Sequence, residues 1–302
     1  MTFRLVGYVE LPEHQSSGGF DHAAVHRGRR QLFVAHTAND AVEVIDLERD
    51  AYVGSIRGLP GVAGALVSDE RDLVFTSNRA ADTVSVISAT ELLVVTTVPV
   101  GSRPNGLALD EGRGVLLAAG VGAPYTLTFV DIAKAGPVGS IQVAGRTRWA
   151  IYDRSSDAFF VNIADPPGIV VVDAGDPTEV SRTIPVPVAG PHGLDIDPAG
   201  RLFCACDGGR LLILEPPSYH AVSAVTLAGA PDVIFLDEGP GHIYVAIGDP
   251  GLVQVIDVND RSVDQTVETE AGAHTLALDA DRHRLFVFLP GTHRAAIFEH
   301  EP

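Results

Sequence analysis

A pattern of strand-like segments recurs seven times along the chain, and it constrains the fold more than any other feature of the sequence. Each copy has a short apolar segment, an Asp-rich turn, and then three further segments separated by polar turns. Repeats of about 20–50 residues are typical of solenoids, propellers and arrays of small units. The first segments of the copies lie 40 to 44 residues apart, at Ala23–Val25, Ala65–Val67, Leu107–Leu109, Ala150–Tyr152, Leu194–Ile196, Ile234–Leu236 and Leu276–Leu278.

The segments are predicted to be antiparallel β-strands. They are short, rich in β-branched residues and bounded by Gly, Asp and Pro, as in second strands such as Leu32–Val34 and third strands such as Val42–Asp46. No stretch keeps a helical period. Four strands per copy and seven copies predict an all-β chain of seven four-stranded blades.

The two ends of the chain predict a closed ring. The last copy stops after its third strand, Arg294–Phe298, and a segment resembling the missing fourth strand stands at the front. There, Leu5–Pro12 resembles Tyr52–Pro60, the fourth strand of the first copy. If the N-terminal strand pairs into the last blade, no open sheet edge remains between first and last blades. The predicted fold is a seven-bladed β-propeller formed by residues 1–302 as one domain.

Composition narrows the choice of partners. The chain is 46% hydrophobic, enough for a large core, and carries a formal net charge of −18. That charge disfavours nucleic acid and anionic membrane surfaces, which are bound by clustered Lys and Arg. No apolar run reaches the roughly 18 residues of a membrane helix. The N-terminal segment has the pattern of a strand and not of an export signal, so a cytoplasmic location is expected unless a leader has been removed.

Short motifs within the repeat carry a resemblance to a known family. The turns Pro104-Asn105-Gly106 and Pro191-His192-Gly193 and the strand Thr83–Ile87 are the main ones. The repeat resembles the YVTN family of bacterial β-propellers over essentially the whole chain. The resemblance implies the propeller architecture but does not choose a function, because such propellers include binding proteins, lyases and lactone-processing enzymes.

One column of the repeat is polar where its neighbours are apolar. The residue just before each first strand is, in order, Asp21, Ala63, Asn105, Arg148, His192, Asp232 and His274. Since the first strand of every blade lines the central channel, these side chains are predicted to converge at one channel mouth and form a site for a small polar or anionic molecule. They could instead be ordinary hydrated turn residues, but His, Asp, Arg and Asn are the types that bind metals, move protons and hold anions.

Three consecutive blades supply a possible metal site. His192, Asp232 and His274 offer two imidazoles and a carboxylate, a common set for a divalent transition metal with open positions. Arg148 would then hold an oxyanion or a carboxylate of the substrate. Without metal, His192 or His274 could act as a general base, with Arg148 stabilising negative charge.

Four more residues complete the predicted site. Asp21 is a further catalytic candidate, and Asn105 a substrate-binding one. Strand alternation predicts that His22 points away from the axis, although it remains a candidate substrate contact. Tyr152 is expected deeper in the channel, as a polar group that could act as acid or base.

Two classes of function remain open. The first is a metal-assisted lyase or lactone hydrolase, for which there is a loose resemblance to virginiamycin B lyase-like propellers through the Pro191-His192-Gly193 turn. Lactonases of the gluconolactonase type use Glu, Asn and Asp around calcium, and the polar column has no Glu. The second is a propeller that binds a ligand or protein without chemistry. A protein-interaction scaffold is disfavoured because aromatic residues make up only 6% of the chain.

Overall fold

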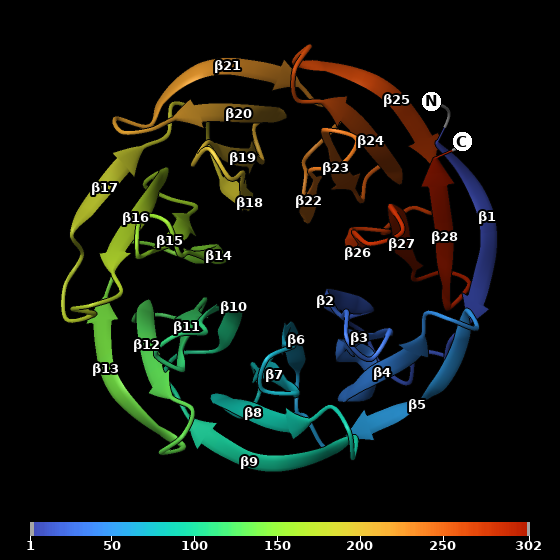
Figure 1. Ribbon diagram of the computed structural model, residues 1–302, viewed down its shortest axis with the longest axis horizontal. Coiled ribbons are helices and arrows are strands. Elements are labelled where there is room, and N and C mark those ends of the chain that lie inside the picture. Colours follow the sequence, from blue (N-terminus) through green and yellow to red (C-terminus); the bar gives the residue numbers. More distant parts are fainter. Residues whose placement is uncertain (1–2, 301–302) are drawn as a thin grey trace.

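The computed structural model, which describes residues 3–300, is a ring of seven four-stranded antiparallel sheets around a central channel (Figure 1). The predicted propeller fold is confirmed. We number the blades 1 to 7 along the chain, and in each the strands run from the channel outward. The strands of blades 1 to 3 are β2 (Phe20–His26), β3 (Gln31–His36), β4 (Ala41–Asp46), β5 (Ala51–Arg57); β6 (Val62–Ser68), β7 (Leu73–Asn78), β8 (Thr83–Ser88), β9 (Leu93–Pro99); β10 (Pro104–Asp110), β11 (Val115–Gly120), β12 (Thr126–Asp131) and β13 (Gly136–Gln142).

The remaining blades repeat this order. Their strands are β14 (Thr147–Asp153), β15 (Ala158–Ile163), β16 (Gly168–Asp173), β17 (Arg182–Pro185); β18 (Pro191–Ile196), β19 (Leu202–Cys206), β20 (Arg210–Glu215), β21 (His220–Thr226); β22 (Ile234–Asp237), β23 (His242–Ile247), β24 (Leu252–Asp257), β25 (Ser262–Glu268); β26 (Thr275–Asp279), β27 (Arg284–Leu289), β28 (Arg294–His300) and, outermost, β1 (Phe3–Glu10). The one helical segment of residues 3–300 is a 3₁₀ turn at Thr37–Asn39. No helix in that range is long and apolar enough to cross a bilayer.

The hydrophobic core lies between neighbouring blades. Apolar side chains of the second and third strands face the adjacent sheet, as where Phe129 of β12 meets Phe159 of β15 with ring centroids 5.6 Å apart. Burial of one such side chain contributes about 1.5–3 kcal/mol. The fourth strands form the outer rim, and their side chains are mostly exposed, as in β9.

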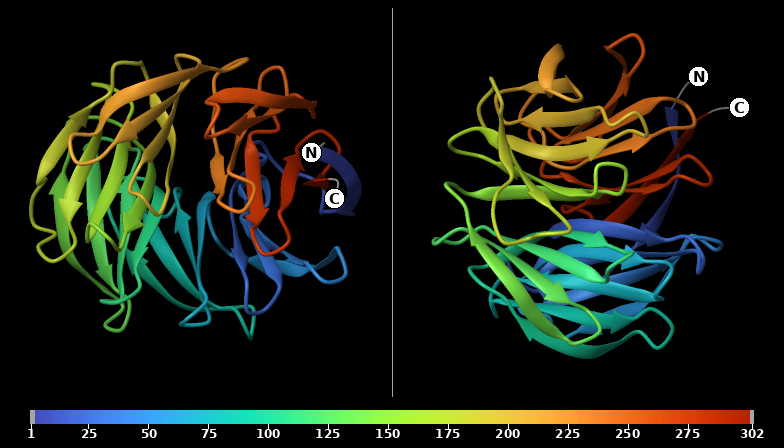
Figure 2. Two further views of the ribbon diagram at one scale, coloured as in Figure 1. Left: turned by 45° about the horizontal axis from the view of Figure 1, so that its top comes forward. Right: turned by 60° about the vertical axis from the view of Figure 1, so that its left-hand side comes forward.

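The N-terminal strand closes the ring as predicted. β1 pairs antiparallel with β28, from Phe3 opposite His300 to Glu10 opposite Arg294. The described ends of the chain therefore lie side by side at the rim (Figure 2). The Phe3 ring is buried against Tyr244 and Phe298, and the Gln265 side-chain amide bonds both the N–H and the carbonyl of Phe3, at 2.8 and 2.7 Å.

Each of the first five innermost strands begins with a β-bulge. In β2, the partner changes from His36 opposite Phe20 to Val34 opposite Ala23, so one extra residue is inserted. Equivalent irregularities occur at the start of β6, β10, β14 and β18. A bulge lets two consecutive side chains face the same way. In blades 1 to 5, two consecutive residues of the innermost strand can therefore both point into the channel at its mouth.

Candidate functional site

The channel mouth at the start of the innermost strands is a small polar cavity. It has a volume of about 70 Å³, and Asp21, Asn105, Arg148, His192 and Asp232 all line it. Five side chains of the polar column, from blades 1, 3, 4, 5 and 6, are thus brought together. The cavity is also lined by residues that the column did not include, namely His22, Arg79, Val121, Arg146 and Trp149.

His192 stands between two carboxylates. Its Nδ1 lies 2.8 Å from Asp207 Oδ1, and its Nε2 lies 3.1 Å from Asp232 Oδ1. Burial lowers the pKa of His192, but Asp232 and Asp207 outweigh it and raise the pKa to about 9. Burial likewise opposes ionisation of Asp232, yet the charge of His192 holds the pKa of that carboxyl well below its usual range. At neutral pH, His192 is therefore an imidazolium with a proton on each nitrogen.

Three arginines line the cavity together with this imidazolium. Arg148 Nη1 lies 3.3 Å from His192 Nε2, and Arg148 Nε is buried without a hydrogen-bond partner. Arg79 donates from Nε to Asn105 Oδ1 and from Nη2 to Asp21 Oδ2, both at 2.8 Å. Arg146 pairs with no carboxylate of the described chain, and burial together with Arg148 and Arg79 lowers its pKa. A local surplus of positive charge therefore exists on a protein with a net charge of −18.

The sequence did not predict three residues of this site, Arg79, Arg146 and Asp207, because none of them lies in the polar column of the repeat. Arg79 follows the second strand of blade 2, and Asp207 follows the second strand of blade 5. The second strand ends beside the start of the first, so the residue after it also faces the mouth. Arg146 stands two residues before Arg148, just ahead of β14. The position after each second strand and the position two residues before the polar column are the ones that would have identified these three residues.

Glycines fix how closely adjacent blades approach at the mouth. A methyl group on Gly106 would lie 2.5 Å from the carbonyl oxygen of Arg148, and one on Gly193 would lie 2.5 Å from that of Asp232. A methyl group on Gly64 would lie even closer to the carbonyl oxygen of Asn105. The glycine of each Pro-x-Gly turn therefore allows the next blade to place its own mouth residue against it.

Two predicted site residues lie away from this cluster. His274 is near enough to Asp232 to lower its pKa, but it does not line the cavity and its Nδ1 donates to the Gly272 carbonyl at 2.7 Å. Tyr152 lies toward the other end of the channel, where its hydroxyl donates to Asp157 Oδ1 at 2.9 Å. Burial and the Asp157 carboxylate raise the pKa of Tyr152 to about 12.

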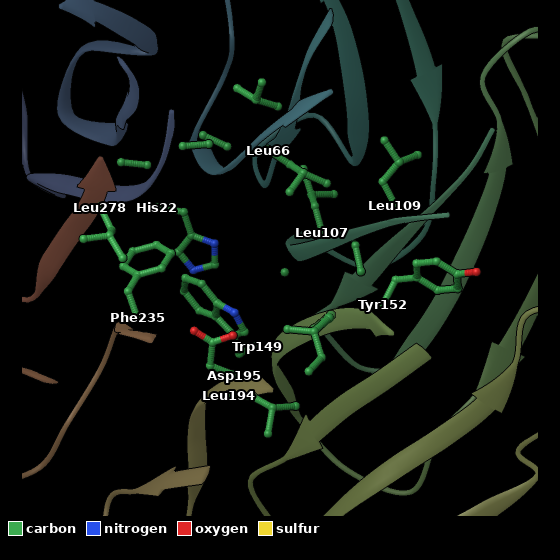
Figure 3. Close-up of a pocket in the computed structure, with 18 of the residues that line it drawn as sticks. His22, Leu66, Leu107, Leu109, Trp149, Tyr152, Leu194, Asp195, Phe235 and Leu278 are labelled. Carbon is green, nitrogen blue, oxygen red and sulfur yellow. The ribbon is translucent and has the colours of Figure 1, made fainter. Parts of the chain in front are cut away.

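The predicted orientation of His22 is wrong. Because of the bulge in β2, its side chain points into the channel, where its ring lies against Trp149 with centroids 4.3 Å apart. Burial lowers the pKa of His22, so the ring is neutral. His22 and Trp149 line both the mouth cavity and a larger cavity of about 440 Å³ behind it (Figure 3). These two rings therefore stand between the polar mouth and the rest of the channel.

Comparisons with known proteins agree on the fold alone. Among solved structures, the chain is similar to Kuenenia stuttgartiensis hydrazine synthase, with a TM-score of 0.82 and 13% sequence identity over 93% of this chain and 96% of that one. No family model matches the chain. No curated protein matches it either. At this identity the likeness shows a seven-bladed propeller and carries no activity with it.

The side chains of the predicted metal site make other contacts in this structure. Across residues 3–300, no three His, Cys, Asp or Glu side chains are placed to share a metal ion. His192 presents each ring nitrogen to a carboxylate, and the described nitrogen contact of His274 is with a backbone carbonyl. An ion on His192, Asp232 and His274 would require His192 to lose a proton and the side chains to turn. That site stays a prediction.

Proposed function

We propose that the channel mouth binds a small anionic molecule, such as a carboxylate. The observation that carries the proposal is a group of three cations in one concave cavity. The imidazolium of His192 lies beside Arg148, and Arg146 pairs with no carboxylate of the described residues. Guanidinium groups pair with carboxylates through two parallel hydrogen bonds. The buried, unpartnered Nε of Arg148 would gain an acceptor on ligand binding.

We further propose that the bound anion reacts, as in a lyase or a lactone hydrolase. Asp207 would keep its hydrogen bond to Nδ1 of His192, while Nε2 exchanges Asp232 for a leaving oxygen and donates its proton to that oxygen. Arg148 can stabilise the negative charge that develops on an enolate or a tetrahedral oxyanion. A propeller that binds the anion and performs no chemistry needs the same arginines, so turnover distinguishes the two.

The repeat motifs support a relation to YVTN-type propellers. The Pro-x-Gly turns and the Thr83–Ile87 strand are the basis of that proposal, and the glycines of those turns have a defined role at the mouth. A relation to virginiamycin B lyase-like enzymes rests on the His192 turn alone.

Replacing either arginine should weaken anion binding. Arg148→Gln and Arg146→Gln are each expected to weaken the binding of succinate or malonate about 10- to 100-fold, the effect of losing a charge-assisted hydrogen bond. Isothermal titration calorimetry measures this directly. Arg154→Gln is the matched control, because Arg154 is an exposed arginine at the opposite end of β14. Equal affinities for the wild type and both mouth variants would refute the proposal.

The affinity for the anion should depend on the proton of His192. It is expected to stay level from pH 6.5 to near 9 and to fall as the imidazolium deprotonates above that value. Since the folded-state pKa is raised, the proton also stabilises the fold fully below about 6.5, and this stabilisation is lost as the pH rises through 9. His192→Gln should bind more weakly and lose the decline near pH 9. A wild-type affinity that falls already near pH 6.5 would contradict the assignment.

A further inference from the structure

The larger cavity of the channel, behind His22 and Trp149, has the size and lining of a small-molecule site. Its volume of about 440 Å³ falls within the range of roughly 300–1,000 Å³ typical of ligand pockets. The walls are mainly apolar side chains of the innermost strands, among them Leu66, Leu107 and Leu278 (Figure 3). The polar mouth shares only His22 and Trp149 with this cavity, so the two are otherwise lined by different residues.

Two carboxylates line this cavity. Glu111 pairs with Arg71, and Arg27, which also lines the cavity, pairs with Asp281. The other carboxylate, that of Asp195, projects from β18 into the apolar wall. It accepts backbone N–H bonds from Ile196 at 2.8 Å and from Leu236 at 2.7 Å, and no described Lys, Arg or His pairs with it. Burial raises the pKa of Asp195 to about 6, against the opposing effect of those two bonds and with further help from Glu238 and Asp197. At neutral pH most of the population is ionised, which leaves a half-buried negative charge in the cavity wall without a counter-cation.

Two aromatic rings flank this carboxylate. Trp149 and Phe235 both line the cavity, with ring centroids 6.3 Å apart and planes at 85°, so they form a corner. The N–H that Asp195 Oδ2 accepts belongs to Leu236, the residue after Phe235, and Figure 3 shows the carboxylate pointing toward the Trp149 ring. Aromatic faces attract cations through the ring quadrupole, and quaternary or primary ammonium groups are bound in such corners.

We propose that this cavity binds an organic ammonium ion with an apolar body, the ammonium lying at Asp195 beside the edge-to-face pair of Trp149 and Phe235. The apolar body would extend along Leu66 and Leu107 toward the open end of the channel. A cation would neutralise the half-buried Asp195 carboxylate, and the acidic protein attracts cations from solution. An anionic ligand would meet the Asp195 charge instead and is disfavoured.

The chain contains one tryptophan, and Trp149 lines both the cavity and the mouth, so its fluorescence is followed with the mouth saturated by malonate. We would titrate the whole protein with 2-phenylethylammonium, 2-phenylethanol and phenylacetate, three probes of nearly equal size that are cationic, neutral and anionic. The ammonium is expected to bind at least about tenfold more tightly than the alcohol, and the carboxylate more weakly than both. Equal binding of ammonium and alcohol, or preference for phenylacetate, would overturn the proposal.

Two variants test whether the preference for the ammonium over the alcohol depends on Asp195 and Phe235. Asp195→Asn should remove it, so that ammonium and alcohol bind alike, while Phe235→Leu should weaken the ammonium several-fold more than the alcohol. Glu238→Gln is the control, because Glu238 is an exposed carboxylate close enough to raise the pKa of Asp195. If Glu238→Gln lowers ammonium affinity as much as Asp195→Asn, a diffuse acidic field and not a site is responsible. If Asp195→Asn does not fold, unchanged selectivity in Phe235→Leu still refutes the proposal.

Discussion

A chain that lacks residues 1–11 is expected to lose most of the stability of the ring. The deletion removes β1 and with it the buried side chains Phe3, Val9 and Leu11. At about 1.5–3 kcal/mol for each, the free energy of unfolding should fall by roughly 4–9 kcal/mol. That is comparable to the whole stability of a typical domain, about 5–15 kcal/mol. Urea denaturation followed by circular dichroism measures the change.

The control for this deletion is complementation. A synthetic peptide of residues 1–11 added to the truncated protein should pair with β28 and restore part of the lost stability in a concentration-dependent way. A scrambled peptide of the same composition should not. A truncated protein that unfolds at the same urea concentration as the full chain would show that β1 is dispensable for closure.

The second large effect is expected at a buried hydrogen-bonded pair in blade 1. His36 Nδ1 lies 2.8 Å from Glu43 Oε1, both side chains are fully buried, and Glu43 also accepts from the Ser55 hydroxyl at 2.6 Å. His36→Leu leaves the Glu43 carboxylate without its partner and should reduce the free energy of unfolding by about 3–5 kcal/mol. Chemical denaturation is again the measurement.

A double variant at His36 and Glu43 distinguishes the polar contribution of this pair to the free energy of unfolding from its packing contribution. His36→Leu combined with Glu43→Leu removes both buried polar groups and should recover much of the loss, because no charge is then left unpaired. Arg49→Ala breaks the exposed pair of Arg49 with Asp46 and should change stability by less than about 1 kcal/mol. A double variant as unstable as His36→Leu would mean that the pair contributes through shape alone.

The architecture could be predicted because it depends on periodicity. Seven copies of a strand pattern leave few alternatives, and the likeness of Leu5–Pro12 to Tyr52–Pro60 predicts the pairing of β1 with β28. The polar column was also visible, since repeat spacing alone aligns Asp21, Asn105, Arg148, His192 and Asp232, which the cavity does bring together.

The rest depends on local geometry that periodicity does not encode. Strand alternation failed at His22 because the bulge of β2 inserts a residue that no composition rule marks. Asp207, which lies 15 residues away in sequence, acts with Asp232 to raise the pKa of His192, and its role follows only from the distance between the two side chains. Asp195 was counted as part of an apolar strand, and its exposure to the channel became evident only from the arrangement of blades 5 and 6.

The close contacts at Gly64, Gly106 and Gly193 separate the shape of the mouth from its chemistry. In each, the glycine meets the backbone carbonyl of the next blade's mouth residue and not its side chain. The position of the main chain is therefore independent of whether Asn105, Arg148 or Asp232 carries an amide, a guanidinium or a carboxylate. Single substitutions at these positions can exchange one functional group for another while the ring keeps its form, so that a new ligand preference could evolve without any intermediate that must refold.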